Sequence, residues 1–245
     1  MQKNATSGKI LLLMALVCVS LAPGSFASAE GDPLETITYN ISPIGKSEYQ
    51  DFGTVDLQGA KVNLVVFKTF VAGFKDTEKI YSDPKNNLPL RVERDVTIWL
   101  HNEKLVEEYT PKERKLVITK FEGGKKTDQY NFKSTGPIHN AVLLPFSIRK
   151  VPQLKIGWST IIRLPSQFKV KLSSIEDITV PAGKFKAYHF TSEPSKFEIW
   201  ISSDKLRIPI KIKGLNGLSY TLSMVKYNSK QKTQVKSEEK DQTKN

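Results

Sequence analysis

The alternation of apolar and polar side chains is the feature that most constrains the fold of this 245-residue chain. Successive side chains of a β-strand point to opposite faces, so a two-residue period predicts a strand with one buried face. The clearest example is residues 205–213, where basic residues alternate with Leu206, Ile208, Ile210 and Ile212. The same period runs through most of residues 34–227. We therefore expect a mainly β protein, built as an antiparallel meander.

Turn signals divide this region into strands. Pro181 presets φ at the second position of a turn, and Gly183 accepts the left-handed conformation that closes it. Asn216-Gly217 supplies the two positive-φ residues of a type I′ hairpin turn. With these and similar turns as boundaries, we expect strands at residues 36–40, 54–57, 61–69, 78–82, 90–101, 104–110, 115–121, 128–132, 176–180, 185–190, 197–201, 205–213 and 218–227.

Two residues modify this pattern. Pro209 cannot donate a hydrogen bond to a neighbouring strand, so we expect strand 205–213 to lie at a sheet edge or to contain a bulge. Asn140 has a side chain suited to accept a free backbone N–H, which predicts a short helix between it and Lys150. This is the one helix that the sequence indicates.

Several strands are apolar on both faces, which a sheet covered on one side would not require. Two architectures remain open: a single curved sheet that forms a half-barrel around an apolar interior, or two packed sheets. Strand parity makes five residues candidates to line the core or a cavity: Trp99, Trp200, Ile208, Ile210 and Ile212.

The first 29 residues have the features of an export signal. Lys3 and Lys9 precede an unbroken apolar run at residues 10–19. This run is shorter than the roughly 20 residues that span a bilayer. Ala27-Ser28-Ala29 offers the small side chains that a signal peptidase requires. We expect cleavage after Ala29, a periplasmic or secreted protein, and no membrane span thereafter.

The lone Cys18 leaves with this signal. Lipidation at Cys18 is the alternative, but Val17 is bulky where a small residue is usual. The mature chain would then be one β-rich domain, residues 30–228. Residues 229–245 contain a single apolar residue, Val235, so we expect them to form a disordered polar tail.

Charge is unevenly distributed along the chain, whose formal net charge is +12. Residues 129–175 hold seven bases and no acid, and residues 205–237 hold eight bases and no acid. Such asymmetry indicates an anionic partner or surface, although a merely solvated basic face would look the same. By parity, the candidate contacts to an anionic surface are Arg207, Lys211 and Lys213.

Catalytic and metal-binding motifs are not evident. The three histidines, His101, His139 and His189, do not have the spacing of metal ligands. No G-x-S-x-G elbow supports a hydrolase, which stays a minor alternative. Nucleic acid would fit the charge but not the export signal. We therefore predict no catalytic residues, no metal and no cofactor.

Three segments carry a family resemblance: residues 180–185 (VPAGKF), 199–204 (IWISSD) and 207–210 (RIPI). Together they resemble an uncharacterised family of bacterial envelope proteins known as the domain of unknown function 3108. The resemblance covers residues 34–227 and is most specific in the last third. It implies an exported, curved, mostly antiparallel sheet that looks like the half-barrels of lipoprotein carriers. It implies no catalytic residues.

These observations predict a non-enzymatic binding or carrier protein. Its ligand would be an apolar or amphipathic anionic envelope component, such as a lipid, a lipid-linked glycan or a lipoprotein. The alternative is a structural or interaction protein of the envelope, with a self-filled core, that docks a partner through an edge strand.

Overall fold

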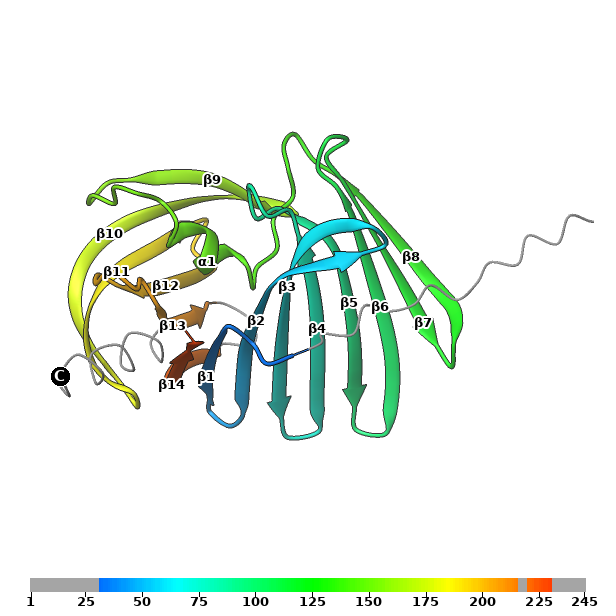
Figure 1. The fold of residues 1–245 in the computed structure, drawn as a ribbon, viewed down its shortest axis with the longest axis horizontal. Helices are drawn as coiled ribbons and strands as arrows, with labels where there is room; N and C mark the ends of the chain where they lie inside the picture. Colours follow the sequence, from blue (N-terminus) through cyan, green and yellow to red (C-terminus); the bar gives the residue numbers. More distant parts are fainter. Residues whose placement is uncertain (1–30, 216–219, 231–245) are drawn as a thin grey trace, which may run out of the picture.

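The protein folds as one long curved antiparallel sheet, shown in Figure 1. The computed structural model describes residues 31–215 and 220–230. Within them, 14 strands follow the order β8-β7-β6-β5-β4-β3-β2-β1-β14-β13-β12-β11-β10-β9. The two ends of this order do not pair, so the sheet is open. The mainly β fold with a half-barrel shape is thus confirmed, and the two-sheet alternative is not what forms.

The strands are β1 (Glu35–Ser42), β2 (Lys46–Leu57), β3 (Ala60–Val71), β4 (Phe74–Ser82), β5 (Pro89–Ile98), β6 (His101–Thr110), β7 (Lys115–Glu122), β8 (Lys125–Lys133), β9 (Ser159–Leu164), β10 (Ser166–Val180), β11 (Gly183–Glu193), β12 (Phe197–Ser202), β13 (Pro209–Gly214) and β14 (Thr221–Ser229). The one helix among the described residues is α1 (Leu144–Ile148). Among the described residues, no helix combines the length and the apolar character needed to cross a membrane.

The sheet consists of two meanders joined at a seam. Each consecutive pair of strands from β1 to β8 forms a hairpin, and so does each pair from β9 to β14. The seam is the antiparallel pairing of β1 with β14, in which Glu35 lies opposite Ser229. Segments from the two ends of the described chain therefore lie side by side in the middle of the sheet (Figure 1).

The segment that links the two meanders, residues 134–158, crosses the inner face of the sheet and contains α1. Figure 1 shows α1 within the curl of the C-terminal strands. Leu144 and Ile148 pack into an apolar cluster with residues of β9 to β12. Phe146 belongs to a second cluster that includes residues of β1 to β7. The linker thus provides the core between the two halves of the sheet.

The prediction that Asn140 caps the helix is wrong, because the N-cap is Leu143 and no side chain caps it. Asn140 instead stabilises the turn that precedes the helix. Its side chain accepts hydrogen bonds from the backbone N–H groups of Val142 (2.9 Å) and Leu143 (3.2 Å). The helix begins at Leu144. Pro145 lies in its first turn, where the missing N–H of proline costs no hydrogen bond within the helix.

The prediction that residues 205–213 form an edge strand is wrong. β13 lies between β12 and β14, and Pro209 pairs with Ile201 where the register shifts. The bulge alternative is therefore the correct one, because a register shift accommodates a residue that donates no hydrogen bond. The edges of the sheet are β8 and β9 instead.

Two further differences concern strand bounds. The strand prediction omitted β9 and the first ten residues of β10, where Phe168, Val170 and Leu172 do alternate with polar residues. β14 continues through Ser229, one residue into the segment predicted to be a tail. β13 and β14 pair as the predicted hairpin, but Asn216 and Gly217 lie outside the described residues.

Candidate functional site

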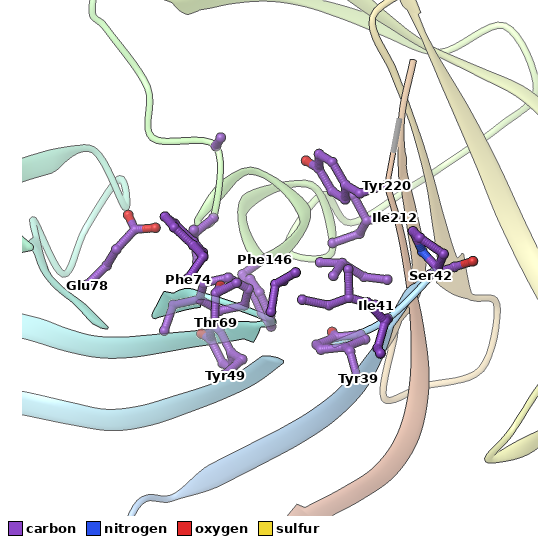
Figure 2. Close-up of a pocket in the computed structure, with 17 residues that line it drawn as sticks. Tyr39, Ile41, Ser42, Tyr49, Thr69, Phe74, Glu78, Phe146, Ile212 and Tyr220 are labelled. Atoms are coloured by element: carbon purple, nitrogen blue, oxygen red, sulfur yellow. The ribbon is translucent and has the colours of Figure 1, made fainter. Parts of the chain in front are cut away.

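A largely apolar cavity of about 650 Å³ lies on the inner face, beside α1. Strands β1 to β4 form one wall, the linker forms a second, and residues from the β13–β14 hairpin close the third. Its lining includes Ile41, Tyr49, Phe67, Phe74, Phe146 and Tyr220. Glu78 is the single acidic residue in the lining, and no lysine or arginine of the described chain contributes to it. Figure 2 shows Glu78 at one end of the cavity and Tyr220 near the other.

Aromatic contacts hold the base of this cavity. The ring of Tyr49 stacks on Phe146 of α1, with centroids 3.7 Å apart and planes 8° from parallel. Tyr39 donates its hydroxyl to the Pro209 carbonyl oxygen at 2.9 Å. Burial raises the pKa of Tyr39 well above its usual value, so the phenol remains a neutral donor. These contacts connect β1 and β2 to the linker and to β13.

The linker is also held by an ion pair. Arg149 donates to both carboxylate oxygens of Glu35, at 2.8 and 2.7 Å, and its guanidinium lies 5.0 Å from the Phe146 ring centroid. A two-pronged pair of this kind fixes the guanidinium in one orientation. Arg149 immediately follows α1, so the pair locks the helix against the seam strand β1.

Three carboxylates surround one guanidinium beyond the Glu78 end of the cavity. Arg94 of β5 pairs with Asp76 of β4, and its Nε lies 3.9 Å from Glu78 Oε2. Its Nη1 lies 3.8 Å from Glu107 Oε1 of β6. We call these four residues the Arg94 cluster. The side chain of Asp76 is 4% exposed, that of Glu78 15% and that of Glu107 11%.

Burial has the largest effect on the ionisation of Glu78. It raises the pKa of Glu78 to about 7, because the neighbouring negative charges of Asp76 and Glu107 add to the effect and Arg94 offsets only part of it. Tyr109 donates its hydroxyl to Glu107 Oε2 at 2.6 Å. The cluster is therefore a buried site with more negative than positive groups.

A second, smaller hollow of about 300 Å³ lies over this cluster. Its lining includes Glu78, Arg94, Glu107 and Tyr109, together with Asn140 of the linker. We call it the polar groove. The cavity and the polar groove share Glu78, Ala141 and Val142, so they adjoin one another under the linker. Sequence reasoning missed this groove, because its charged residues come from three strands whose register brings them together.

Comparisons with known proteins bear on the whole fold. A family model described as "Protein of unknown function (DUF3108)" matches residues 28–223, which is most of the chain. The protein belongs to this family. A comparison with curated proteins finds no match. The DUF3108 resemblance inferred from the three sequence segments is therefore confirmed.

In this DUF3108 protein, the Trp-x-Ser-x-Asp and Arg-Ile-Pro segments form a structural clasp. Ser202 Oγ donates to Asp204 Oδ1 at 2.9 Å and accepts the Ile208 N–H at 2.8 Å. Asp204 Oδ1 also accepts the N–H groups of Leu206 and Arg207. Arg207 then donates to linker carbonyls: those of Arg149 (3.2 Å), Pro152 (3.0 Å) and Val151. The clasp thus fastens the part of the linker that follows α1.

The grouping of Arg207 with Lys211 and Lys213 is therefore wrong. Arg207 precedes β13, has a φ of +47°, and directs its guanidinium to the linker. Lys211 lies with its Nζ 4.8 Å from the centroid of the Trp200 ring, and Lys213 lies opposite Glu198. The two lysines thus meet an aromatic ring and an acid from another strand, although no acid is close to them in sequence.

The five residues predicted for the core or cavity have different positions. Ile212 lines the cavity, whereas Ile208 and Ile210 are buried in the core beside it. Trp200 is buried as well: it stacks on His189 at 4.3 Å and donates to Glu176 at 2.7 Å. The expectation for Trp99 is wrong, because it is 77% exposed in the β5–β6 turn. Its ring lies against Gly73, where a Cβ would be 2.7 Å from a ring carbon.

The turn residues predicted at the β10–β11 hairpin occupy that turn. Gly183 has a φ of +132°, which strains any residue with a side chain, and Pro181 precedes it by two positions. The hairpin tip contacts the seam, since the Ala182 N–H donates to the Met224 carbonyl oxygen at 3.0 Å.

One group of residues has the composition of a metal site. His101, Glu103 and Glu122 bring their ligand atoms within 4.8 Å of one another at the rim of the sheet. Lys120 Nζ, however, contacts Glu103 at 2.6 Å and Glu122 at 2.9 Å. The lysine ammonium therefore occupies the position between the two carboxylates that a cation would take.

Proposed function

We propose that this DUF3108 protein is an exported, non-enzymatic carrier that binds the apolar chain of an amphiphile of the cell envelope. The observation that supports the proposal is the cavity of about 650 Å³ beside α1, whose wall is apolar except for a few polar groups. Small-molecule sites usually have volumes of about 300–1,000 Å³ and this kind of lining.

The architecture also supports a binding role. The cavity lies between three separate parts of the chain: the N-terminal strands, the linker and the β13–β14 hairpin. The Arg149–Glu35 pair and the Arg207 clasp hold the linker in place beside it. With the export signal that the sequence predicts in residues 1–29, the proposal is that the carrier acts in the periplasm or outside the cell.

A specific observation favours the second candidate, an interaction protein. All nine residues of β8 are exposed, and β8 is an edge of the sheet. An exposed edge strand can pair with a strand of another protein. The cavity is the stronger argument, because a self-filled core would not leave such a volume beside the linker.

A cavity-filling variant tests the carrier function. Thr69→Phe adds an aromatic ring inside the cavity, whereas the control Thr110→Phe adds the same ring at an exposed strand end. We expect native mass spectrometry of protein purified from its own envelope to show a retained lipid-sized mass for the wild type and for Thr110→Phe. Thr69→Phe should lose it. Absence of any retained mass, or equal retention by both variants, would contradict the proposal.

The same spectra test export. Cleavage after Ala29 predicts an intact mass that begins at Glu30, in protein released by osmotic shock. An uncleaved N-terminus or a lipid attached to Cys18 would contradict this part of the proposal.

A further inference from the structure

The Arg94 cluster, which lies under the polar groove and next to the apolar cavity, has more acidic than basic groups. Asp76, Glu78 and Glu107 together contribute three carboxyl groups, and Arg94 contributes one guanidinium. Arg94 is also the one cation among the described groups that act on the pKa of Glu78. Buried charge is costly unless it is paired, so one arginine leaves this cluster in need of a positive group.

An unsatisfied acceptor in the cluster points the same way. Asp76 Oδ1 is buried and has no hydrogen-bond partner among the described residues. Glu107 uses one oxygen for the Tyr109 hydroxyl, and its other oxygen is 3.8 Å from Arg94. The carboxylates of Glu78 and Glu107 both line the groove. The cluster thus has acceptor capacity that its own arginine does not use.

The placement of Glu78 connects this charge to the cavity. Glu78 lies at one end of the cavity in Figure 2, and it also lines the polar groove. A molecule whose apolar chain lies in the cavity would therefore bring its polar end to Glu78. We propose that this end carries an ammonium group, which Glu78 and Glu107 bind in the polar groove. The inference rests on the proposed function and specifies its ligand as a cationic or zwitterionic amphiphile.

This ligand differs from the anionic one that the basic composition indicates. An acidic head group would meet Glu78 and Glu107, and the guanidinium of Arg94 is already engaged by Asp76. The lysines considered for an anionic contact, Lys211 and Lys213, do not line the cavity or the polar groove. The other titratable groups that line the groove are neutral. Burial and the charge of Glu107 raise the pKa of Tyr109. Burial and the positive charge of Arg163 lower the pKa of His139.

Three probes with the same twelve-carbon chain test the inference: dodecylamine, dodecanoic acid and dodecyl maltoside. Each is titrated into the mature protein by calorimetry, below its micelle concentration, at pH 8 and low salt. The amine is cationic at this pH because alkylammonium groups titrate near about 10.4. We expect dodecylamine to bind at least tenfold more tightly than dodecanoic acid.

Two isosteric variants locate the preference. Glu78→Gln and Glu107→Gln should each reduce the amine-to-acid affinity ratio by roughly tenfold, which is the effect of removing one favourable charge contact of moderate strength. Glu103→Gln is the matched control, because Glu103 is on the adjoining part of the same face but pairs with Lys120. Its ratio should equal that of the wild type. A thermal melt of each variant checks that it is folded.

The outcomes separate the two proposals. If all probes bind equally, or the acid binds best, the cavity takes an apolar chain but the ammonium site is refuted. If the maltoside binds best and Glu78→Gln has no effect, the groove recognises a neutral polyol instead. If no probe binds the folded wild type, the carrier function itself is refuted. Loss of folding in Glu78→Gln leaves Glu107→Gln to decide the result.

Discussion

The two meanders of the sheet use their inner faces differently. The C-terminal strands curl around the linker, and their cluster contains Leu172, Phe190 and Ile201, none of which is accessible to solvent. The inner face of β4 to β7 instead carries charged residues beside buried apolar ones such as Ile80 and Val92. Filling one half with the chain's own side chains allows the other half to remain open for a ligand.

The largest expected effect is on the free energy of unfolding, when one phenylalanine from each meander is replaced by alanine. Phe190→Ala in β11 removes a side chain with no solvent exposure, so we expect a loss of about 3–5 kcal/mol in the free energy of unfolding. Phe132→Ala in β8 removes one that is 38% exposed, and it should cost less than about 1 kcal/mol. Denaturant titrations of both variants measure the difference. Similar losses would show that the two halves are packed alike.

A smaller effect is expected when the contact between the Arg207 clasp and the linker is removed. Arg207→Ala removes a charged donor that contacts three carbonyl groups, so we expect a loss of about 2–3 kcal/mol. Limited proteolysis should then cut the linker faster. The control Lys213→Ala removes a cation with no linker contact in the described chain and should leave both measurements near wild-type values. Equal behaviour of the two variants would refute the clasp.

The smallest effect concerns the charged inner face. Burial raises the pKa of Glu78 from its ordinary value of 4.5 to about 7, so the folded state binds this proton more tightly than the unfolded chain does. Its contribution to stability is therefore fully present below pH 4.5 and is lost as the pH rises through 7.

Glu78→Gln removes this dependence. The variant should be more stable than the wild type at pH 8, by up to about 2 kcal/mol, and the difference should shrink at pH 5. The groups that face Glu78 are Asp76, Glu107 and Arg94, and the paired comparison keeps them constant. Unfolding free energies of both proteins at the two pH values provide the test. A constant difference would mean that Glu78 titrates normally.

Local patterns predicted much of the fold but little of the site. Alternation located most strands, and turn chemistry located the β10–β11 hairpin. The first part of β10 also alternates, at Phe168, Val170 and Leu172, so this part of the strand is predictable from the sequence as well. Pro209 is incompatible with a regular interior strand, but a bulge allows β13 to lie inside the sheet. The sequence alone does not distinguish this bulge from a position at the sheet edge.

The site depends on register, which a single sequence does not specify at long range. Asp76 and Glu78 belong to β4, Arg94 to β5 and Glu107 to β6, and only the pairing of these strands assembles them. Arg207 shows the same limit in another form. It has the parity of a strand residue, but a positive φ directs its side chain to the linker, which precedes it by more than fifty residues in sequence.

The seam between β1 and β14 also has a consequence for the order in which the chain assembles. Most strands find their partner in the next hairpin, but β1 must wait for nearly the whole polypeptide before its second edge is paired. Contacts between such distant residues slow folding, because a long loop must close before they form. Until that moment β1 presents an open edge, and so does β14. Truncation before Thr221 would remove β14 and leave β1 and β13 as exposed edges at the centre of the molecule, where strands of different copies could pair.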